Sequence, residues 1–263
     1  MDTLALLETA EQAARGGGEL LLARLTQPRQ ISKKGLRDLV TEVDIAAQQW
    51  ITTFIRGRFP EHGFLTEERD DGLPAGADIT WIIDPIDGTS NYSRQQPIFC
   101  ISIGVAKGPE IVAGVIFDPV RQELFGAAAD RGATLNGQPI HVSPVTEPQE
   151  AILSLDWSRQ PAMRQQTLEM VQAILHTVHT VRGLGSAALA LAWLATGRLD
   201  GYFHLTAQAW DLAAGSLLVT EAGGKVSDMS GRDWSWLAPQ NGCLATNGHL
   251  HPTLHRLLAP SPN

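Results

Sequence analysis

One short stretch constrains this chain more than any other, because an apolar run leads directly into a pair of aspartates. Residues 81–92 read Trp-Ile-Ile-Asp-Pro-Ile-Asp-Gly-Thr-Ser-Asn-Tyr. The apolar start predicts a buried strand, the proline fixes a turn, and Gly88 permits backbone geometry that other residues resist. Asp84, Asp87 and a free carbonyl at a strand end form a cluster of hard oxygens suited to Mg²⁺. If Gly88 and Thr89 open a helix, their N–H groups also suit a phosphate. Taken alone, these residues are more often explained by a turn that is capped by the aspartate side chains.

Composition excludes several classes of protein. The chain has 263 residues, 43% of them hydrophobic, and a net charge of −8 with acidic and basic residues intermixed, which disfavours nucleic-acid binding by a basic face. No apolar run approaches the ~20 residues of a membrane span, and the first residues lack the pattern of a signal peptide. Cys100 and Cys243 sit in apolar runs and are interpreted as reduced core thiols rather than a disulfide. We therefore expect a cytoplasmic protein with no membrane or nucleic-acid partner.

The order of predicted elements indicates an α+β chain. Helical spacing of apolar residues predicts a helix through residues 6–21 and a second one, with Trp50 on its apolar stripe, that starts at a capping box formed by Thr41 and Asp44. Four β-type runs then follow, separated by turn residues, which predicts an antiparallel meander. They span residues 79–83, 99–105, 111–117 and 123–129.

A polar, proline-containing stretch at residues 143–148 is the best boundary in the chain. After it, strand and helix patterns alternate, with a strand at 152–155 and helices at 163–175, 187–196 and 211–222. We predict two halves: an N-terminal α+β half, residues 1–143, that carries the antiparallel sheet and the metal-binding motifs, and a C-terminal α/β half, residues 144–263, that completes the active site.

Two further groups of acids lie far from the aspartate pair in sequence. Glu67 and Glu68 follow an apolar pair, and an isolated pair of this kind is more often a solvated surface feature. Asp211 opens a helix of small residues, where an aspartate commonly serves as an N-terminal cap. Neither group identifies a site by itself, but their order along the chain does.

Together these motifs resemble the inositol monophosphatase family, which belongs to a superfamily of lithium-sensitive, metal-dependent phosphatases with fructose-1,6-bisphosphatase. The matching segments run in order from about residue 31 to residue 224, and are Asp38-Leu39-Val40-Thr41 with Asp44, Glu67-Glu68, Asp84-Pro85-Ile86-Asp87-Gly88-Thr89 and Trp210-Asp211-Leu212-Ala213-Ala214-Gly215. The resemblance implies an α+β fold, a layered α-β-α-β-α sandwich of the fructose-1,6-bisphosphatase/inositol-monophosphatase type.

The resemblance also implies roles for individual residues. The metal ligands for two or three Mg²⁺ ions would be Glu67, Asp84, the Ile86 carbonyl, Asp87 and Asp211. Glu67, Thr89 and Asp44 would be catalytic, with Thr89 and Asp44 positioning and deprotonating the attacking water. The substrate would contact Asp87, Gly88, Thr89, Gly185, Ser186, Ala187, His204 and Asp211. Lys34 stands at the position of a loop lysine of the family. A homodimer and inhibition by Li⁺ are implied as well.

His204 departs from the pattern of inositol-selective members, which carry a glutamate at this position. Neutral imidazole can accept one hydrogen bond from a ring hydroxyl but offers no carboxylate, and a partly buried strand residue explains His204 as well. We also consider Arg159 as a residue that faces the substrate. The expected reaction is Mg²⁺-dependent hydrolysis of small phosphate monoesters, inositol 1-phosphate first. The alternatives are a related phosphatase acting on histidinol phosphate, fructose 1,6-bisphosphate or 3′-phosphoadenosine phosphate, and a non-catalytic regulatory protein on the same fold.

Overall fold

The computed structural model describes residues 2–27, 31–35, 38–68 and 77–259, and for residues 31–40 the backbone alone. Its α-helices are α1 (Thr3–Arg24), α2 (Glu42–Arg56), α3 (Thr89–Ser93), α4 (Pro161–Ile174), α5 (Ala187–Ala195), α6 (Ala209–Glu221) and α7 (His251–Leu258). Its strands are β1 (Ile31–Gly35), β2 (Asp38–Thr41), β3 (Gly63–Thr66), β4 (Ile79–Asp87), β5 (Cys100–Lys107), β6 (Glu110–Asp118), β7 (Glu123–Ala128), β8 (Ala133–Leu135), β9 (Gln138–Ile140), β10 (Ile152–Leu155), β11 (Thr180–Gly183), β12 (Gly201–His204), β13 (Lys225–Ser227) and β14 (Cys243–Thr246).

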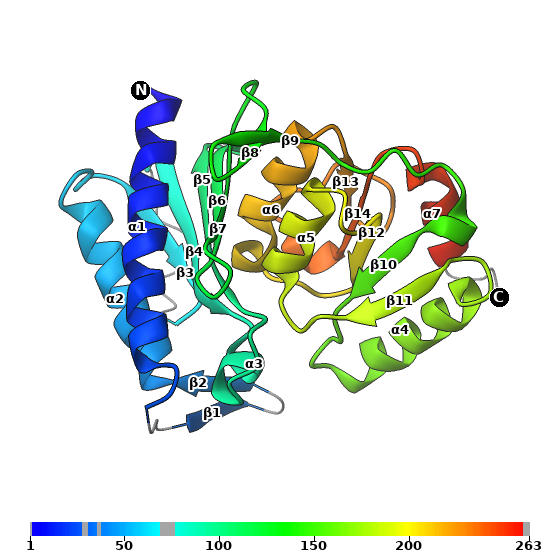
Figure 1. The fold of residues 1–263 in the computed structure, drawn as a ribbon, viewed down its shortest axis with the longest axis horizontal. Helices are drawn as coiled ribbons and strands as arrows, with labels where there is room; N and C mark the ends of the chain where they lie inside the picture. The colour runs from blue at the N-terminus through cyan, green and yellow to red at the C-terminus, as the bar shows by residue number, and fades with distance from the viewer. Residues whose placement is uncertain (1, 28–30, 36–37, 69–76, 260–263) are drawn as a thin grey trace.

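The elements form alternating layers of helices and sheets (Figure 1). From left to right in the figure, α1 and α2 lie on a seven-stranded sheet, α5 and α6 lie between the two sheets, and α4 and α7 cover the far side of a five-stranded sheet. This order is the α-β-α-β-α sandwich that the family resemblance implies, and the predicted α+β class is confirmed.

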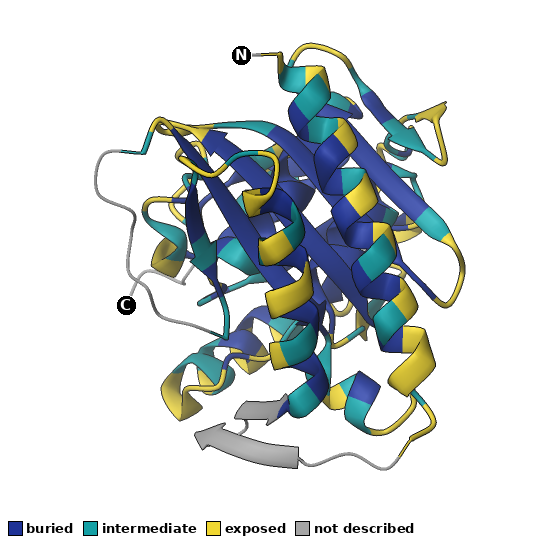
Figure 2. Cartoon of the chain, turned by 90° about the vertical axis from the view of Figure 1, so that its left-hand side faces the viewer, coloured by how far each residue is buried: buried dark blue, intermediate teal, exposed yellow. Residues whose placement is uncertain are grey.

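The seven-stranded sheet contains the predicted meander. Its order is β3-β4-β5-β6-β7-β8-β9, with β3 parallel to β4 and all other neighbours antiparallel. Every residue of β4 is buried, because helices cover both faces of this sheet. Figure 2 shows α1 and α2 on the outer face, with their buried stripes toward the strands and their exposed residues toward solvent. One residue of the predicted stripe differs: Trp50 is 37% exposed and stacks on Phe54, 5.2 Å between ring centroids.

The inner face of the same sheet packs against α6, and small residues permit the close approach. Ala213 and Ala214 of α6 face the strands, and a Cβ atom added at Gly114 of β6 would lie 2.8 Å from the Ala214 carbonyl oxygen. A side chain at this position would therefore push the helix off the sheet. Since α6 also carries Asp211, the packing of small residues fixes the height of that carboxylate above the strands.

The five-stranded sheet has the order β11-β10-β12-β14-β13. Its strands β10, β11 and β12 are mutually parallel, so their carboxyl ends meet at one edge of the sheet, and in open α/β sheets ligands bind outside such an edge. The strand at 152–155 and the helices that the sequence predicts in this region are all present, with ends shifted by one or two residues. The division into halves at residues 143 and 144 remains a prediction.

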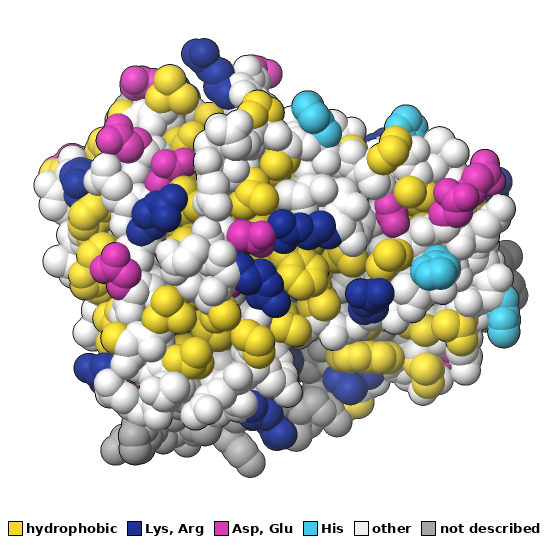
Figure 3. Space-filling view, in the orientation of Figure 1, with side chains coloured by type: hydrophobic (Ala, Val, Ile, Leu, Met, Phe, Trp, Pro, Cys, Tyr) yellow, Lys and Arg dark blue, Asp and Glu magenta, His cyan; other side chains and the backbone are white. Residues whose placement is uncertain are grey.

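The structure also bears out the sequence predictions on the two cysteines and on the mixing of charges. Cys100 and Cys243 are free and buried, as predicted. Among the residues that the structure describes, no helix is long and apolar enough to cross a membrane. On the face shown in Figure 3, acidic and basic side chains are interspersed with apolar ones, in keeping with the mixed charge pattern of the sequence.

Candidate metal centre and substrate pocket

Three carboxylates from distant parts of the chain meet at the centre of the molecule. Asp84 and Asp87 end the buried strand β4, and Asp211 lies in the first turn of α6. One oxygen from each lies within 4.8 Å of the others. The strand end and the helix start bring the three together because α6 packs across the strands of the large sheet.

Each of these carboxylates has one oxygen held by hydrogen bonds from the protein. Asp87 Oδ2 accepts from the Ser186 hydroxyl (2.6 Å) and from the Ala188 N–H (2.7 Å), at the start of α5. Asp211 Oδ2 accepts from the Gln208 N–H (2.7 Å), and Asp84 Oδ1 accepts from the Ile86 N–H (2.9 Å). These bonds fix the direction of each carboxylate and occupy one of its two oxygens.

The electrostatics of the cluster favour a cation. Burial raises the pKa of Asp84, Asp87 and Asp211, most strongly for Asp84 and Asp211. For Asp84, the charges of Glu67, Asp87 and Asp211 and a hydrogen bond with the Glu67 carboxyl raise the pKa further. Crowded, desolvated carboxylates of this kind repel one another unless a cation neutralises them. The donor set is all oxygen, so the residues present fit a hard divalent cation such as Mg²⁺.

Glu67 is placed beside this cluster by the parallel pairing of β3 and β4. It follows the last residue of β3, and its N–H donates to the Ile83 carbonyl oxygen of β4 (3.2 Å). Its carboxylate lies 3.8 Å from the guanidinium of Arg159, which reaches over from the C-terminal half. Glu67 thus lies beside the three aspartates, and its role as a metal ligand remains a prediction.

Thr89 and Asp44 form a hydrogen-bonded pair next to the acids. The Thr89 hydroxyl lies 3.0 Å from Asp44 Oδ1 and 3.1 Å from the Ile86 carbonyl oxygen, and its single hydrogen can go to only one of them. Asp44 is the stronger acceptor when ionised. Its other oxygen accepts from the Thr41 N–H (2.8 Å) in the predicted capping box. Burial raises the pKa of Asp44, while the hydrogen bonds from Thr41 and Thr89 oppose that rise.

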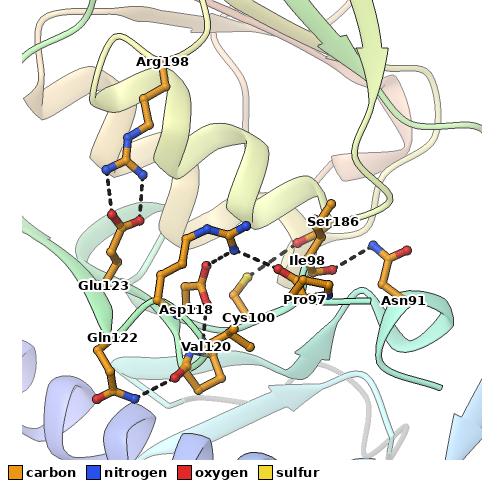
Figure 4. A network of polar contacts seen from close by, with 12 residues as sticks. Asn91, Pro97, Ile98, Cys100, Asp118, Val120, Gln122, Glu123, Ser186 and Arg198 are labelled. Carbon is orange, nitrogen blue, oxygen red and sulfur yellow. Dashed lines mark hydrogen bonds and ion pairs between the residues drawn. The ribbon is translucent and has the colours of Figure 1, made fainter. Parts of the chain in front are cut away.

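Gly88 connects the strand to the short helix α3 and requires its lack of a side chain. Its φ is +101°, and an added Cβ atom would lie 2.9 Å from the Ile98 carbonyl oxygen. Next to it, the Asn91 amide donates to the carbonyl oxygens of Ile98 (2.7 Å) and Leu184 (2.9 Å), which ties this loop to the one before α5. Figure 4 shows Asn91 beside Ile98, with Ser186 and Cys100 close by.

The acids line a cavity of about 440 Å³, to which residues from both sides of position 143 contribute. Most residues that the sequence analysis singles out line it, namely Glu67, Asp84, Ile86, Asp87, Gly88, Thr89, Arg159, Gly185, Ala187, His204 and Asp211. Asp44 stands behind Thr89. Ser186 differs from expectation: its side chain is buried and donates to Asp87, so it holds a carboxylate rather than lining the pocket. The side chains of Lys34 and Asp38 lie outside the described part of the structure.

His204 contradicts one detail of the sequence interpretation. Its Nδ1 accepts a hydrogen bond from the Thr206 N–H (3.1 Å), so this nitrogen carries no proton. Burial, followed by the nearby charge of Arg159, lowers the pKa of His204 to about 4, which makes the ring neutral at physiological pH. The proton of the neutral ring then sits on Nε2. His204 therefore offers the pocket a donor, and not the acceptor that we expected of a neutral imidazole.

Sequence reasoning missed several residues of the pocket. Asp156, Trp157, Arg164, Tyr202 and Trp210 all line the cavity. Asp156 follows the strand 152–155 directly, the same strand-end signal that identified Asp84 in the first half of the chain. The signal was thus present, but no motif around Asp156 drew attention to it.

Comparison with known proteins places this geometry in a family. The sequence matches the profile of the Inositol monophosphatase family over residues 2–262. It is 36% identical to "Inositol monophosphatase 3" of Solanum lycopersicum over 250 residues, which cover 93% of this chain and 92% of that protein. It is 38% identical to "Nus factor SuhB" of Escherichia coli K12 over 229 residues, or 86% of each chain. The fold matches the crystal structure of the extragenic suppressor protein suhB of Bartonella henselae with a TM-score of 0.93 and 32% identity, covering 98% of this chain and 100% of that one.

The layered fold and the carboxylate cluster together define the class of metal-dependent phosphatases. Within that class, the chain belongs to the inositol monophosphatase family. The resemblance that the sequence motifs indicate is thereby confirmed.

Proposed function

We propose that this protein hydrolyses small phosphate monoesters in a Mg²⁺-dependent reaction, with inositol 1-phosphate as the first substrate to test. The single observation that carries the proposal is the cluster of Asp84, Asp87 and Asp211, whose oxygens lie within 4.8 Å of one another at the bottom of the cavity. Family membership supports the reaction type, and the name of the tomato relative supports the choice of substrate.

The proposed metal ligands are Glu67, Asp84, the Ile86 carbonyl, Asp87 and Asp211. Bound divalent cations would supply a more acidic water and would offset negative charge on the attacking and leaving oxygens. The Gly88 and Thr89 amides are proposed to hold the ester phosphate, because the loop lies beside the acids and lacks a side chain at Gly88.

The protein residues around the attacking water have separable roles. With its hydrogen donated to Asp44, the Thr89 hydroxyl keeps its lone pairs for accepting a hydrogen bond from the water. Asp44 stabilises that orientation, and Glu67, which also lines the cavity, is proposed to accept a proton. In the reaction, water oxygen bonds to phosphorus, the ester P–O bond breaks, and the leaving alcohol oxygen takes up a proton. The products are the alcohol and inorganic phosphate.

Release of inorganic phosphate tests the proposal directly. The purified protein is incubated with inositol 1-phosphate, histidinol phosphate, fructose 1,6-bisphosphate and 3′-phosphoadenosine phosphate, each with and without Mg²⁺. We expect turnover that requires the metal, with inositol 1-phosphate among the fastest esters. Turnover of another ester far above that of inositol 1-phosphate would overturn the substrate assignment, while the absence of all turnover would overturn the proposed function.

The name of the E. coli relative, a Nus factor, raises a second candidate in which the fold serves a role without hydrolysis. The complete set of acids at the cavity argues for catalysis in this chain. The two candidates are separated by Asp87→Asn, which should abolish hydrolysis and leave a non-catalytic role intact.

Several finer properties rest on family resemblance and belong to the same proposal. They are a cytoplasmic location, a homodimer, two or three Mg²⁺ ions per active site and inhibition by Li⁺, with no nucleic-acid or membrane partner. Light scattering at several protein concentrations tests the dimer, and titration of activity with Li⁺ at fixed Mg²⁺ tests the inhibition.

A further inference from the structure

Three parallel strands of the smaller sheet end at one wall of the cavity, beside the acid cluster. Leu155, the last residue of β10, pairs with Gly183 of β11 on one side and with Phe203 of β12 on the other. The residues just beyond these positions are Asp156, the loop around Gly185, and His204. All three line the cavity. This wall therefore faces the part of a substrate that extends away from the metal centre.

Asp156 places a carboxyl group in that wall and is held there by two donors. Its Oδ1 accepts from the Gly185 N–H (2.8 Å), and its Oδ2 lies 3.3 Å from the hydroxyl of the buried Tyr202, a long contact. A carboxylate offers about four lone-pair positions, so these bonds leave acceptor capacity. Asp156 is half-buried and lines the cavity, so it can accept a further hydrogen bond from a ligand hydroxyl.

His204 supplies the opposite polarity on the same wall. With Nδ1 committed to the Thr206 N–H, its neutral ring has one donor left, the Nε2–H. Asp156 and His204 thus present an acceptor and a donor within one pocket. An alcohol that carries adjacent hydroxyl groups matches both, because each hydroxyl can donate one hydrogen bond and accept another.

The cations near this wall already have partners. Arg159 lies 3.8 Å from Glu67, and Arg164 donates to the Ser158 carbonyl oxygen (3.3 Å) with its guanidinium 5.2 Å from the Trp157 ring. A second phosphate beside this wall would be repelled by the ionised Asp156 carboxylate. The wall therefore favours an uncharged alcohol over a bisphosphate.

We propose that Asp156 determines substrate specificity by accepting a hydrogen bond from a hydroxyl of the leaving alcohol, while His204 Nε2–H donates to a neighbouring oxygen. The substrate class is a polyol monophosphate with at least two free hydroxyl groups close to one another. This inference rests on the proposed phosphatase function and assigns the acceptor role to a residue outside the family motifs. Burial, followed by the charge of Asp87, raises the pKa of Asp156 to about 7, and the carboxyl carbonyl oxygen still accepts a hydrogen bond when the group is protonated.

The test compares two esters that differ at this wall. Inositol 1-phosphate carries several hydroxyl groups, whereas p-nitrophenyl phosphate carries none. For Asp156→Asn we expect kcat/KM for inositol 1-phosphate to fall about 10- to 100-fold, mainly through KM, because one oxygen that accepts from the substrate becomes a donor. The loss for p-nitrophenyl phosphate should be smaller by about tenfold or more. The inhibition constant of inorganic phosphate, which reaches only the metal end, should change by less than about twofold.

Matched variants separate a role in specificity from a role in folding. Asp130→Asn changes the same group at an exposed position with φ of +61°, which asparagine also adopts, and should behave as the wild type. Tyr202→Phe removes only the hydroxyl next to Asp156 Oδ2 and should give a loss of about two- to tenfold that is again larger for inositol 1-phosphate. If Asp156→Asn fails to fold, this second variant carries the test.

Some results would overturn only the assignment of Asp156, and others would reject the proposed phosphatase function. Equal losses on both esters, or a weakened inhibition by phosphate, would place Asp156 at the metal end and overturn the assignment. No loss on inositol 1-phosphate would overturn it as well, and so would wild-type turnover of fructose 1,6-bisphosphate faster than that of inositol 1-phosphate. A wild-type protein that hydrolyses no ester with Mg²⁺ gives a different pattern, which rejects the proposed function and the assignment of Asp156 with it.

Discussion

The two walls of the pocket are built on different principles. On the metal side, Asp84 and Asp87 come from the end of one strand, and Asp211 comes from the first turn of a helix that packs across that strand's sheet. On the substrate side, Asp156, Gly185 and His204 come from the ends of three parallel strands, each with its own following loop. The first wall depends on tight packing of buried elements, and the second on the loops that follow strands.

This difference explains why chemistry and specificity can vary independently. A change on the metal wall alters carboxylates that share charge and hydrogen bonds, so it affects every substrate. A change on the substrate wall alters one contact with the leaving alcohol and affects only the esters that make that contact. The following predictions test this separation, from the largest expected effect to the smallest.

Asp87→Asn should remove hydrolysis of all esters, with kcat reduced by about 10³-fold or more, because one metal ligand loses its charge. The asparagine oxygen can still accept from Ala188 and Ser186, so the fold should persist. We expect the metal-free variant to melt at or above the wild-type temperature, since a repelling charge is removed. Phosphate release and thermal melting measure the two effects, with Asp130→Asn as the control. A variant that kept more than about a tenth of the wild-type rate would contradict the ligand assignment.

Mg²⁺ should stabilise the protein, and more at higher pH. The folded pKa values of Asp84, Asp87 and Asp211 are raised above the ordinary 3.8, so the metal-free protein loses stability as the pH rises above that value. A bound cation reverses this penalty. At about 100 times Kd the gain is about 2.7 kcal/mol, or about 5 to 10 °C in Tm. Melting curves at pH 5 and pH 8, with Mg²⁺ or with chelator, measure it. An equal shift at both pH values would argue against carboxylate ligands that bind protons in the metal-free state.

Thr89→Ala should lower kcat by about 10²-fold on polyol and aryl esters alike, because the hydroxyl that orients the water is lost. Thr89→Ser keeps the hydroxyl bonded to Asp44 and should retain most of the rate. Steady-state kinetics of both variants on inositol 1-phosphate and p-nitrophenyl phosphate provide the measurement. A loss confined to inositol 1-phosphate would move Thr89 to the substrate wall.

His204→Leu should lower kcat/KM for inositol 1-phosphate by about 5- to 10-fold, the effect of losing one neutral hydrogen bond, and should spare p-nitrophenyl phosphate. Titration of His204 should not change the preference for the polyol ester between pH 6 and 8, because its pKa is lowered to about 4 and the ring remains neutral in this range. Any change of preference in this range should come from Asp156, whose pKa is raised to about 7, and should disappear in Asp156→Asn. The exposed His176→Leu serves as the control. A change of preference between pH 6 and 8 that persisted in Asp156→Asn would show that the ring titrates.

The metal wall could be predicted from the sequence because its residues sit in local motifs. The apolar run before Asp84, the glycine at position 88 and the capping box at Thr41 and Asp44 each carry a signal within a few residues. Their convergence in space required the family resemblance, since spacing alone does not bring Asp211 to Asp84. The helices and most strands were predictable for the same local reason.

On the substrate wall, the hydrogen-bond partners of the side chains could not be predicted from the sequence. The tautomer of His204 depends on the Thr206 N–H, a contact set by the turn after β12 and not by residue type. The neighbours of Asp156 lie 29 and 46 residues away along the chain, in the loop before α5 and in strand β12. Ser186 was expected in the pocket but turns inward to Asp87, because the start of α5 packs against the end of β4.

In each of the three aspartates, one carboxylate oxygen accepts hydrogen bonds from the protein, and this affects which metal ion the centre prefers. Since Ser186 and Ala188 hold Oδ2 of Asp87, Gln208 holds Oδ2 of Asp211 and Ile86 holds Oδ1 of Asp84, each group keeps one oxygen free of these bonds. Single-oxygen ligation suits a small octahedral ion that retains several waters, whereas Ca²⁺ gains from carboxylates that bind through both oxygens. We therefore expect the N–H groups of Ile86, Ala188 and Gln208, which are not themselves metal ligands, to bias the centre toward Mg²⁺ over Ca²⁺.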